Sequence, residues 1–249
     1  MAEAAAQGGL ARDTRDGVLW LAFDRPRAAN AVDAPLAQAF AAELAQAAGD
    51  SSVAAVVMTG SGAKVFSAGI DVKNPDNLEH AALSAHRRQV VTTCLSAIVE
   101  FEKPFVAAVN GHAIGLGCML ALLADRVVAA EHAAFSLPEI EIGIPTFLGI
   151  SILARAAGSA VARDLVLTGR RMPAKEARRS GLIAAVASAG ELAGAAQAAA
   201  AALAAKPRTT FALNKRWIAR GLREELAAAN AQSEAVQPLL AAEKAASRD

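Results

Sequence analysis

Apolar residues in the first fifty positions recur with two different spacings. The largely apolar run over residues 17–26 is typical of a strand, and Pro26 ends it. Residues 32–50 carry apolar side chains at helical spacing, with Asp33 and Pro35 where the N-cap and first turn of a helix are expected. The stripe consists of Leu36, Phe40 and Leu44. The pattern therefore predicts a strand followed by an amphipathic helix.

Two later runs, 52–62 and 104–111, are short, apolar and rich in β-branched residues. Such runs are typical of strands buried on both faces of a parallel sheet. The other segments are predicted as a further strand over 65–72, helices over 84–103 and 115–125, and strands and turns over 126–145. From Leu148 onward we expect almost only helix, interrupted at Gly158, Gly169, Pro173 and Gly181. This order predicts an α/β core with a helical tail, and the sequence shows no internal repeat.

Composition limits the class of protein. A chain of 249 residues is long enough for one large domain. Its apolar stretches are shorter than the roughly 20 residues of a membrane span. Lys and Arg number 25 against 24 Asp and Glu, a net charge of +1. We therefore expect neither nucleic acid nor a membrane as partner, and an anionic ligand would have to be bound by local groups.

The cysteines and histidines suggest no redox or metal chemistry. Residues 1–10 lack the basic and apolar segments of a signal peptide, so a cytoplasmic location is expected. Cys94 and Cys118 are then expected to be inert core thiols. His80, His86 and His132 do not have metal-ligand spacing, and no metal is expected.

Two glycine-containing turns are candidates for chemistry by the backbone. In "NGHAIGLGCML" the start of an apolar helix follows closely spaced glycines, and the first N–H groups of a helix have no partner within it. In "FSAGID" the residues Ala68 and Gly69 let the chain turn after a strand, leaving the N–H of Ile70 free to donate. Two such donors directed at one carbonyl oxygen would form an oxyanion hole.

Four segments can be compared with known families: "DRPRAANAV", "VFSAGIDV", "AAVNGHAIGLGCMLALLADRVVAA" and "FSLPEIEIGIP". In their order and approximate spacing they resemble the enoyl-CoA hydratase/isomerase (crotonase) family. The resemblance extends from about Gly17 to the C-terminus. It implies an α/β fold with a spiral of strand–strand–helix repeats that binds acyl-CoA, assigned to residues 1–187. It also implies a C-terminal helical region, 188–249, used to form a homotrimer or a hexamer built as a dimer of trimers. Coenzyme A would be part of the thioester substrate, and no separate cofactor is expected.

The resemblance also assigns roles to individual residues. The thioester oxygen is expected between the N–H groups of Ile70 and Leu116, and Leu116 replaces the family's usual glycine. Phe211 and Lys215, in "FALNKRW", resemble residues that cover the nucleotide of a neighbouring subunit. Further substrate contacts are expected at Arg27, Ala29, Ala31, Ala68, Gly69, Asp71, Val72, Gly115, Gly117 and Met119.

The chain departs from the hydratase pattern at one position. Hydratases of the family use two glutamates to hold and activate water, and here the first position is Met119 while the second is Glu139. Methionine accepts no proton, so the addition of water by two carboxylates is not supported. A single glutamate resembles the family's enoyl-CoA isomerases, in which it moves a proton from C2 to C4 of the thioester. An apolar wall of Leu116 and Met119 would raise the pKa of Glu139. Hydratase activity and a non-catalytic acyl-CoA-binding role stay open as alternatives.

Other polar residues near these segments have simpler interpretations. Glu141 would share a face with Glu139 in an extended chain, and a solvated carboxylate is its expected role. Asp71 is expected to be structural or capping. His112 would suit a hydrolase, but no "GxSxG" surrounds Ser67, so a Ser-His pair is disfavoured.

Overall fold

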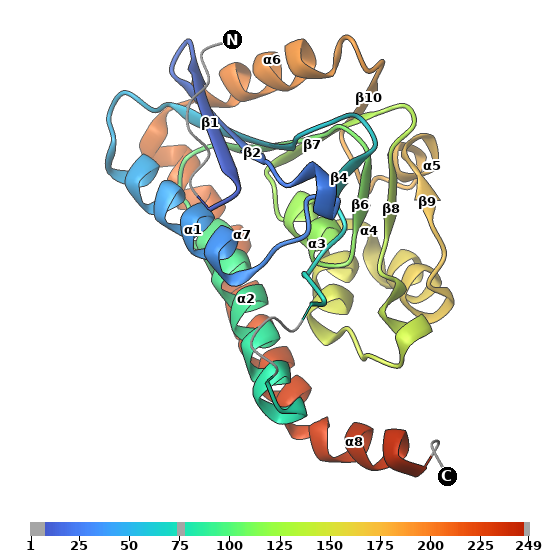
Figure 1. The fold of residues 1–249 in the computed structure, drawn as a ribbon. Coiled ribbons are helices and arrows are strands. Elements are labelled where there is room, and N and C mark those ends of the chain that lie inside the picture. The colour runs from blue at the N-terminus through green and yellow to red at the C-terminus, as the bar shows by residue number, and fades with distance from the viewer. Residues whose placement is uncertain (1–7, 74–77, 247–249) are drawn as a thin grey trace.

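Two β-sheets organise the chain in the computed structural model, which describes residues 8–73 and 78–246 (Figure 1). The large sheet has the order β1-β2-β3-β5-β7-β10, and the small sheet has the order β4-β6-β8-β9. Neighbouring strands are parallel except in the pairs β1–β2 and β8–β9. The large sheet comprises β1 (Leu10–Arg15), β2 (Val18–Phe23), β3 (Ala55–Gly60), β5 (Phe105–Val109), β7 (Arg126–Ala130) and β10 (Ala185–Ala187). The small sheet comprises β4 (Val65–Ser67), β6 (His112–Ile114), β8 (Ala134–Ser136) and β9 (Met172–Pro173).

A strand–strand–helix unit occurs three times in succession. Each unit gives one strand to the large sheet, one to the small sheet, and then a helix. The units are β3-β4-α2, β5-β6-α3 and β7-β8-α4, with α2 at His80–Glu100, α3 at Leu116–Leu122 and α4 at Phe147–Thr168. The chain therefore winds as the predicted α/β spiral, although its sequence shows no repeat.

Helices cover both faces of the large sheet, which explains why its central strands β3, β5 and β7 are mostly apolar. The first helix, α1 (Ala34–Gly49), places Phe40 edge-on against Phe23 of β2 and Phe105 of β5, with ring centroids 5.5 and 6.4 Å apart. On the other face α6 (Leu192–Ala204) runs along β3, β5 and β7 (Figure 1). Leu192 and Ala196 of α6 belong to the same core as β3 and β5. This packing does not test the predicted division of the chain into a core, 1–187, and a C-terminal helical region, 188–249, which stays a prediction.

The predicted first helix is confirmed in detail. Asp33 is its N-cap, and its Oδ1 accepts a hydrogen bond from the N–H of Leu36 at 3.0 Å. Pro35 stands in the first turn, where a missing N–H costs nothing. The stripe of Leu36, Phe40 and Leu44 is buried.

Several predicted element bounds were wrong. Helix α2 ends at Glu100 rather than at residue 103, and α3 ends at Leu122 rather than at residue 125. The stretch after Leu148 contains the short strands β9 and β10, where almost only helix was expected. The sequence Ala185–Ala187 has weak strand propensity, and its pairing with β7 comes from tertiary contact. Strand β1 was not expected because its side chains are mostly polar and exposed.

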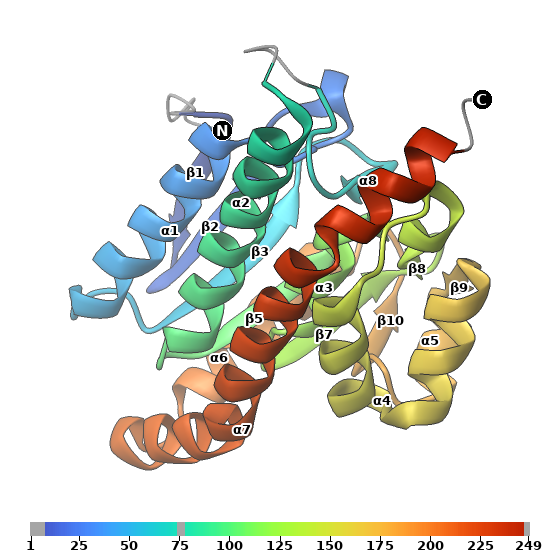
Figure 2. The same ribbon diagram turned by 90° about the horizontal axis from the view of Figure 1, so that it is seen from below.

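The C-terminal part of the chain is mainly helical, and its last helix extends away from the sheets. After the bend at Gly158 in α4 come α5 (Ala174–Arg179), α6, α7 (Arg208–Ala235) and α8 (Gln237–Ala246). Helix α7 packs on α4 and α2, and α8 extends away from the sheets (Figures 1 and 2). Within the described residues no helix combines the length and apolarity needed to cross a membrane.

Candidate active site

Three turns meet at one edge of the small sheet. Strands β4, β6 and β8 are parallel and adjacent, with Ser67 beside Ala113 and Ile114 beside Ser136. Because the carboxyl ends of parallel strands lie at the same edge, the segments that follow them come together there. These segments contain Ile70 after β4, Leu116 after β6 and Glu139 after β8. The topology alone therefore brings three of the predicted site residues to one place.

The first turn fixes the peptide N–H of Ile70. Val32 donates its N–H to the carbonyl of Gly69 at 2.7 Å and accepts from the N–H of Asp71 at 2.8 Å. Ile70 lies between these two bonds, and its own N–H has no hydrogen-bond partner among the described residues. It is held in place but left free to donate.

The second turn provides a matching donor. Leu116 is the first residue of α3, so its N–H has no acceptor within the helix. Gly115 precedes it with φ 53° and ψ −123°, a combination that side-chain-bearing residues avoid. A Cβ on Gly69 would lie 3.2 Å from the nitrogen of Leu116. The two turns therefore approach each other closely, and their free N–H groups lie at the same edge of the small sheet.

Glu139 lies against this pair of turns. It belongs to the 3-10 helix η2 (Pro138–Ile142), and its Oε1 would be 2.9 Å from a Cβ placed on Gly115. Its Oε2 is buried and has no hydrogen-bond partner among the described residues. Burial raises the pKa of Glu139, and a hydrogen bond from its own N–H opposes this only in part. One carboxylate oxygen is thus buried and unpartnered, and the other lies beside the turn that carries the free N–H of Leu116.

The first turn of α3 provides no second acid. Met119 is buried there, with 6% of its surface exposed, and its N–H donates to the carbonyl of Gly115 at 3.0 Å. Cys118 is close enough to Glu139 for the carboxylate charge to add to burial in raising the pKa of the thiol. Gly117 allows close packing, because a Cβ there would lie 2.5 Å from the carbonyl oxygen of Ser67. The helix start thus offers a backbone N–H and an apolar wall.

The first motif packs directly beside the second. After the 3-10 helix η1 (Pro26–Ala28), Ala29 adopts a left-handed conformation and its carbonyl accepts from the N–H of Ala68 at 2.9 Å. Arg27 on η1 and Val72 beyond Ile70 are exposed to solvent. The structure therefore brings together the residues on which coenzyme A contacts were predicted, namely Arg27, Ala29, Ala31, Ala68, Gly69, Asp71 and Val72.

Phe211 and Lys215 lie apart from these turns in the single chain. Phe211 lines a surface cavity of about 260 Å³ at the start of α7, together with Lys103, Lys206 and Arg208. The Lys215 ammonium donates to Asp125 Oδ2 at 2.7 Å and to a backbone carbonyl at 2.9 Å. Burial lowers the pKa of Lys215 and outweighs the Asp125 carboxylate, which acts to raise it. The predicted contact with a neighbour's nucleotide stays a prediction, and it would have to compete with Asp125 for this ammonium.

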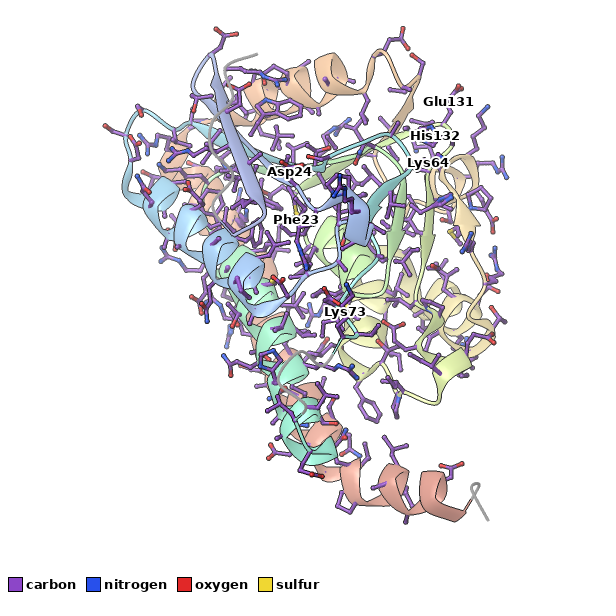
Figure 3. The ribbon with its side chains drawn as sticks, in the orientation of Figure 1. Phe23, Asp24, Lys64, Lys73, Glu131 and His132 are labelled. Carbon is purple, nitrogen blue, oxygen red and sulfur yellow. The ribbon has the colours of Figure 1, made fainter. Side chains whose placement is uncertain are left out.

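His112 and His132 lie at the opposite end of the small sheet from the three turns. His132 Nε2 is 2.8 Å from the Ala63 carbonyl oxygen, and Figure 3 shows His132 beside Lys64, far from Lys73, which follows the turn of Ile70. Burial and the charges of Arg171 and His132 lower the pKa of His112.

Ser67 and the two other carboxylates have structural or solvent-facing positions. The Ser67 hydroxyl donates to the carbonyl of Asn30 at 2.8 Å and accepts from the N–H of Gly69 at 3.2 Å, so it is fully engaged in holding the turn. Asp71 Oδ1 accepts a hydrogen bond from the N–H of Lys73, a structural contact that caps no helix in the described part of the chain. Glu141 is exposed to solvent, as expected, and it lies on the 3-10 helix η2 rather than in an extended segment that would give it a shared face with Glu139.

Two polar residues of the framework were missed by sequence reasoning. Asn30 is buried, and its amide donates to the carbonyls of Ser61 and Val65, both at 2.9 Å, which ties the first motif to the turn before β4. Arg25 binds Asp71 from the other side. The available signal was the occurrence of these polar side chains within "FDRPRAAN", next to a strand that is otherwise apolar.

Comparisons with known proteins match the chain to one family and its fold. A model of the enoyl-CoA hydratase/isomerase family matches residues 13–246. Over 167 residues the chain is 42% identical to the 2,3-dehydroadipyl-CoA hydratase of Escherichia coli K12, a match that covers 67% of this chain and 64% of that protein. An enoyl-CoA hydratase structure from Bacillus anthracis superposes with a TM-score of 0.81 at 28% identity, covering 90% of this chain and 89% of the other. A carnitinyl-CoA dehydratase structure from Mycobacterium avium 104 gives 0.80 at 32% identity, covering 92% and 91%.

Proposed function

Because the chain belongs to the enoyl-CoA hydratase/isomerase family, we propose that it is an enzyme acting on an enoyl-CoA thioester through a stabilised enolate. The observation that carries the proposal is the buried, unpartnered Oε2 of Glu139 at the edge of the small sheet that also carries the free N–H groups of Ile70 and Leu116. A base and an oxyanion hole are the two groups that enolate formation requires.

The proposed reaction is the shift of a double bond from C3–C4 to C2–C3. The thioester oxygen accepts hydrogen bonds from Ile70 and Leu116, and the Glu139 carboxylate removes a proton from C2. The electron pair of the broken C–H bond moves toward the thioester oxygen, giving a dienolate. Glu139 then returns the proton to C4, and the new double bond forms between C2 and C3. The desolvated carboxylate is a stronger base than one in water, which favours the first step.

Isomerase chemistry is favoured over hydration by the number of carboxylates. Hydration requires a group that holds water and takes its proton in addition to the acid that protonates C2, and Met119 can do neither. Hydratase activity is the second candidate, and it is supported by the names of relatives such as the hydratase from Escherichia coli. A non-catalytic acyl-CoA-binding protein is the third candidate, since it would also retain the turns.

Two assays on the purified protein separate these candidates. Formation of the conjugated 2-enoyl-CoA from 3-enoyl-CoA measures isomerisation, and loss of the conjugated absorbance on addition of water to 2-enoyl-CoA measures hydration. We expect isomerisation to be the faster reaction and Glu139→Gln to abolish it. Faster hydration would identify a hydratase, and binding of acyl-CoA without either reaction would identify a binding protein.

We also propose that the protein assembles as a homotrimer or as a dimer of trimers. The support is the face of α7 on which Leu213, Trp217 and Ile218 are 55%, 71% and 75% exposed. Large apolar side chains gathered on one helix are typical of an interaction surface.

We also propose a soluble, cytoplasmic location for the protein. We expect its reaction to need a thioester substrate and no metal or separate cofactor.

A further inference from the structure

The guanidinium of Arg25 joins three acceptors around the turn of Ile70. Its Nη1 donates to the carbonyl of Ala31 at 2.5 Å. Its Nη2 lies 2.9 Å from Asp33 Oδ2 and 3.0 Å from Asp71 Oδ2. One planar side chain therefore connects the first motif with the residue that directly follows Ile70.

Each acceptor is itself fixed to a different part of the fold. Asp33 caps α1 with its other oxygen, and Asp71 Oδ1 accepts from the N–H of Lys73 at 3.1 Å. The carbonyl of Ala31 precedes Val32, whose N–H and carbonyl bond residues 69 and 71. Burial acts to raise the pKa of Asp71, but the Lys73 N–H and Arg25 together lower it below its ordinary value. Asp71 is therefore a charged partner for Arg25 at neutral pH.

The Arg25 side chain has little freedom to move. A Cβ on Gly9 would lie 2.7 Å from Arg25 Cγ and 2.9 Å from Cδ, so the residue that precedes β1 packs closely against the side-chain stem. The backbone N–H of Arg25 donates to Asn30 Oδ1 at 3.1 Å, and only 23% of the side chain is exposed. With its guanidinium bound on both sides, Arg25 is part of the framework rather than a free cation for a substrate phosphate.

We propose that Arg25 is a positioning residue of the oxyanion hole, holding the peptide between Gly69 and Ile70 so that the Ile70 N–H points at the thioester oxygen. This inference rests on the proposed function. A fork of two nitrogens is needed to bind Ala31 and the two carboxylates at once, and a lysine ammonium keeps the charge but not this geometry. Small displacements of a donor are costly, because catalysis depends on the alignment of reacting groups.

The test uses butyryl-CoA labelled with ¹³C at the thioester carbonyl and infrared spectroscopy of the bound ligand. In the wild-type protein the carbonyl stretch is expected to shift to lower frequency, since two N–H donors polarise the bond. In Arg25→Met the shift is expected to shrink while Kd changes little, because other residues bind the coenzyme A portion. Exchange of the C2 protons with heavy water should slow by about 100-fold. The carbonyl shift and the exchange rate of Arg25→Lys should lie between those of the wild type and Arg25→Met.

A matched control is Arg155→Met. Arg155 also makes two hydrogen bonds to a carboxylate, at 2.9 and 2.7 Å to Glu225, but it joins α4 to α7. It should leave the carbonyl shift and the exchange rate unchanged, and an equal loss in this variant would overturn the inference. A carbonyl shift as large as that of the wild type in a folded Arg25→Met would also overturn the inference. If Arg25→Met does not fold, the same result in Arg25→Lys would overturn it. A wild-type protein that shows neither shift nor exchange would instead refute the oxyanion hole itself.

Discussion

At the scale of single residues, the unusual feature is a carboxylate oxygen, Oε2 of Glu139, that is buried without a partner. Glu139 holds its proton to higher pH in the folded protein than in the unfolded chain, because burial raises its pKa. The folded state then binds more protons, so the free energy of unfolding falls as pH rises. This loss begins near the pKa of an unfolded glutamate, about 4.3, and is complete above the folded pKa. The charged Glu139 carboxylate therefore lowers the free energy of unfolding at neutral pH.

Glu139→Gln should remove this penalty. We expect the variant to gain stability relative to the wild type as pH rises, by about 1.4 kcal/mol for each unit by which the folded pKa exceeds the unfolded one. The difference between the two proteins should become constant below about pH 4. Chemical denaturation across this pH range measures it, with the exposed Glu141→Gln as control. A variant that gains nothing between acid and neutral pH would show that Glu139 is not desolvated.

Met119 is the residue that decides between the two chemistries. Met119→Glu should add a second carboxylate to the first turn of α3 and raise the hydration of 2-enoyl-CoA. The change should also destabilise the fold by about 2–3 kcal/mol or more, because a buried acid loses hydration next to apolar neighbours and a second carboxylate. Met119→Gln is the matched control, since it is polar but cannot take a proton. Rapid hydration by the wild type, with no gain in Met119→Glu, would contradict the carboxylate count.

At the scale of elements, the start of α3 acts through its backbone. Leu116→Pro deletes one donor N–H at the first helical position, where proline is tolerated in a helix. The deletion should cost about 3 kcal/mol of transition-state stabilisation, or about 100-fold in kcat. Leu116→Ala is the control, because it also loses the buried side chain but keeps the N–H. Equal kcat values in these two variants would exclude the assigned donor.

The elements also show which parts of the fold the sequence could predict. The start of α1 could be predicted because Asp33 and Pro35 are typical of a helix N-terminus. The turns at Gly69 and Gly115 could be predicted because glycine is typical of such turns. Strand β10 was not, because a short Ala-Val-Ala segment becomes a strand only by pairing with β7. The role of Arg25 was hidden for a similar reason, since Asp71 lies 46 positions away in sequence. Local chemistry predicted the donors, and tertiary contact determined what holds them.

At the scale of the whole molecule, the exposed face of α7 predicts self-association. Leu213, Trp217 and Ile218 would be buried between copies of the chain, which would remove their apolar surface from water. Light scattering at micromolar concentration should give the mass of a trimer or hexamer. Ile218→Asp should weaken the assembly. The control Leu167→Asp should not, because Leu167 is 64% exposed on a different helix, α4. A monomeric wild type would refute this prediction.

The central claim is that Glu139 removes a proton from C2 of a bound thioester while two backbone N–H groups stabilise the enolate. The most direct measurement is the exchange of C2 protons of butyryl-CoA in heavy water, followed by nuclear magnetic resonance. This substrate lacks the double bond, so it reports proton removal without isomerisation or hydration. The account predicts steady exchange by the wild type and none above background by Glu139→Gln, with butyryl-CoA still bound. Exchange that persists in Glu139→Gln, or its absence in a wild-type protein that binds butyryl-CoA, would contradict it.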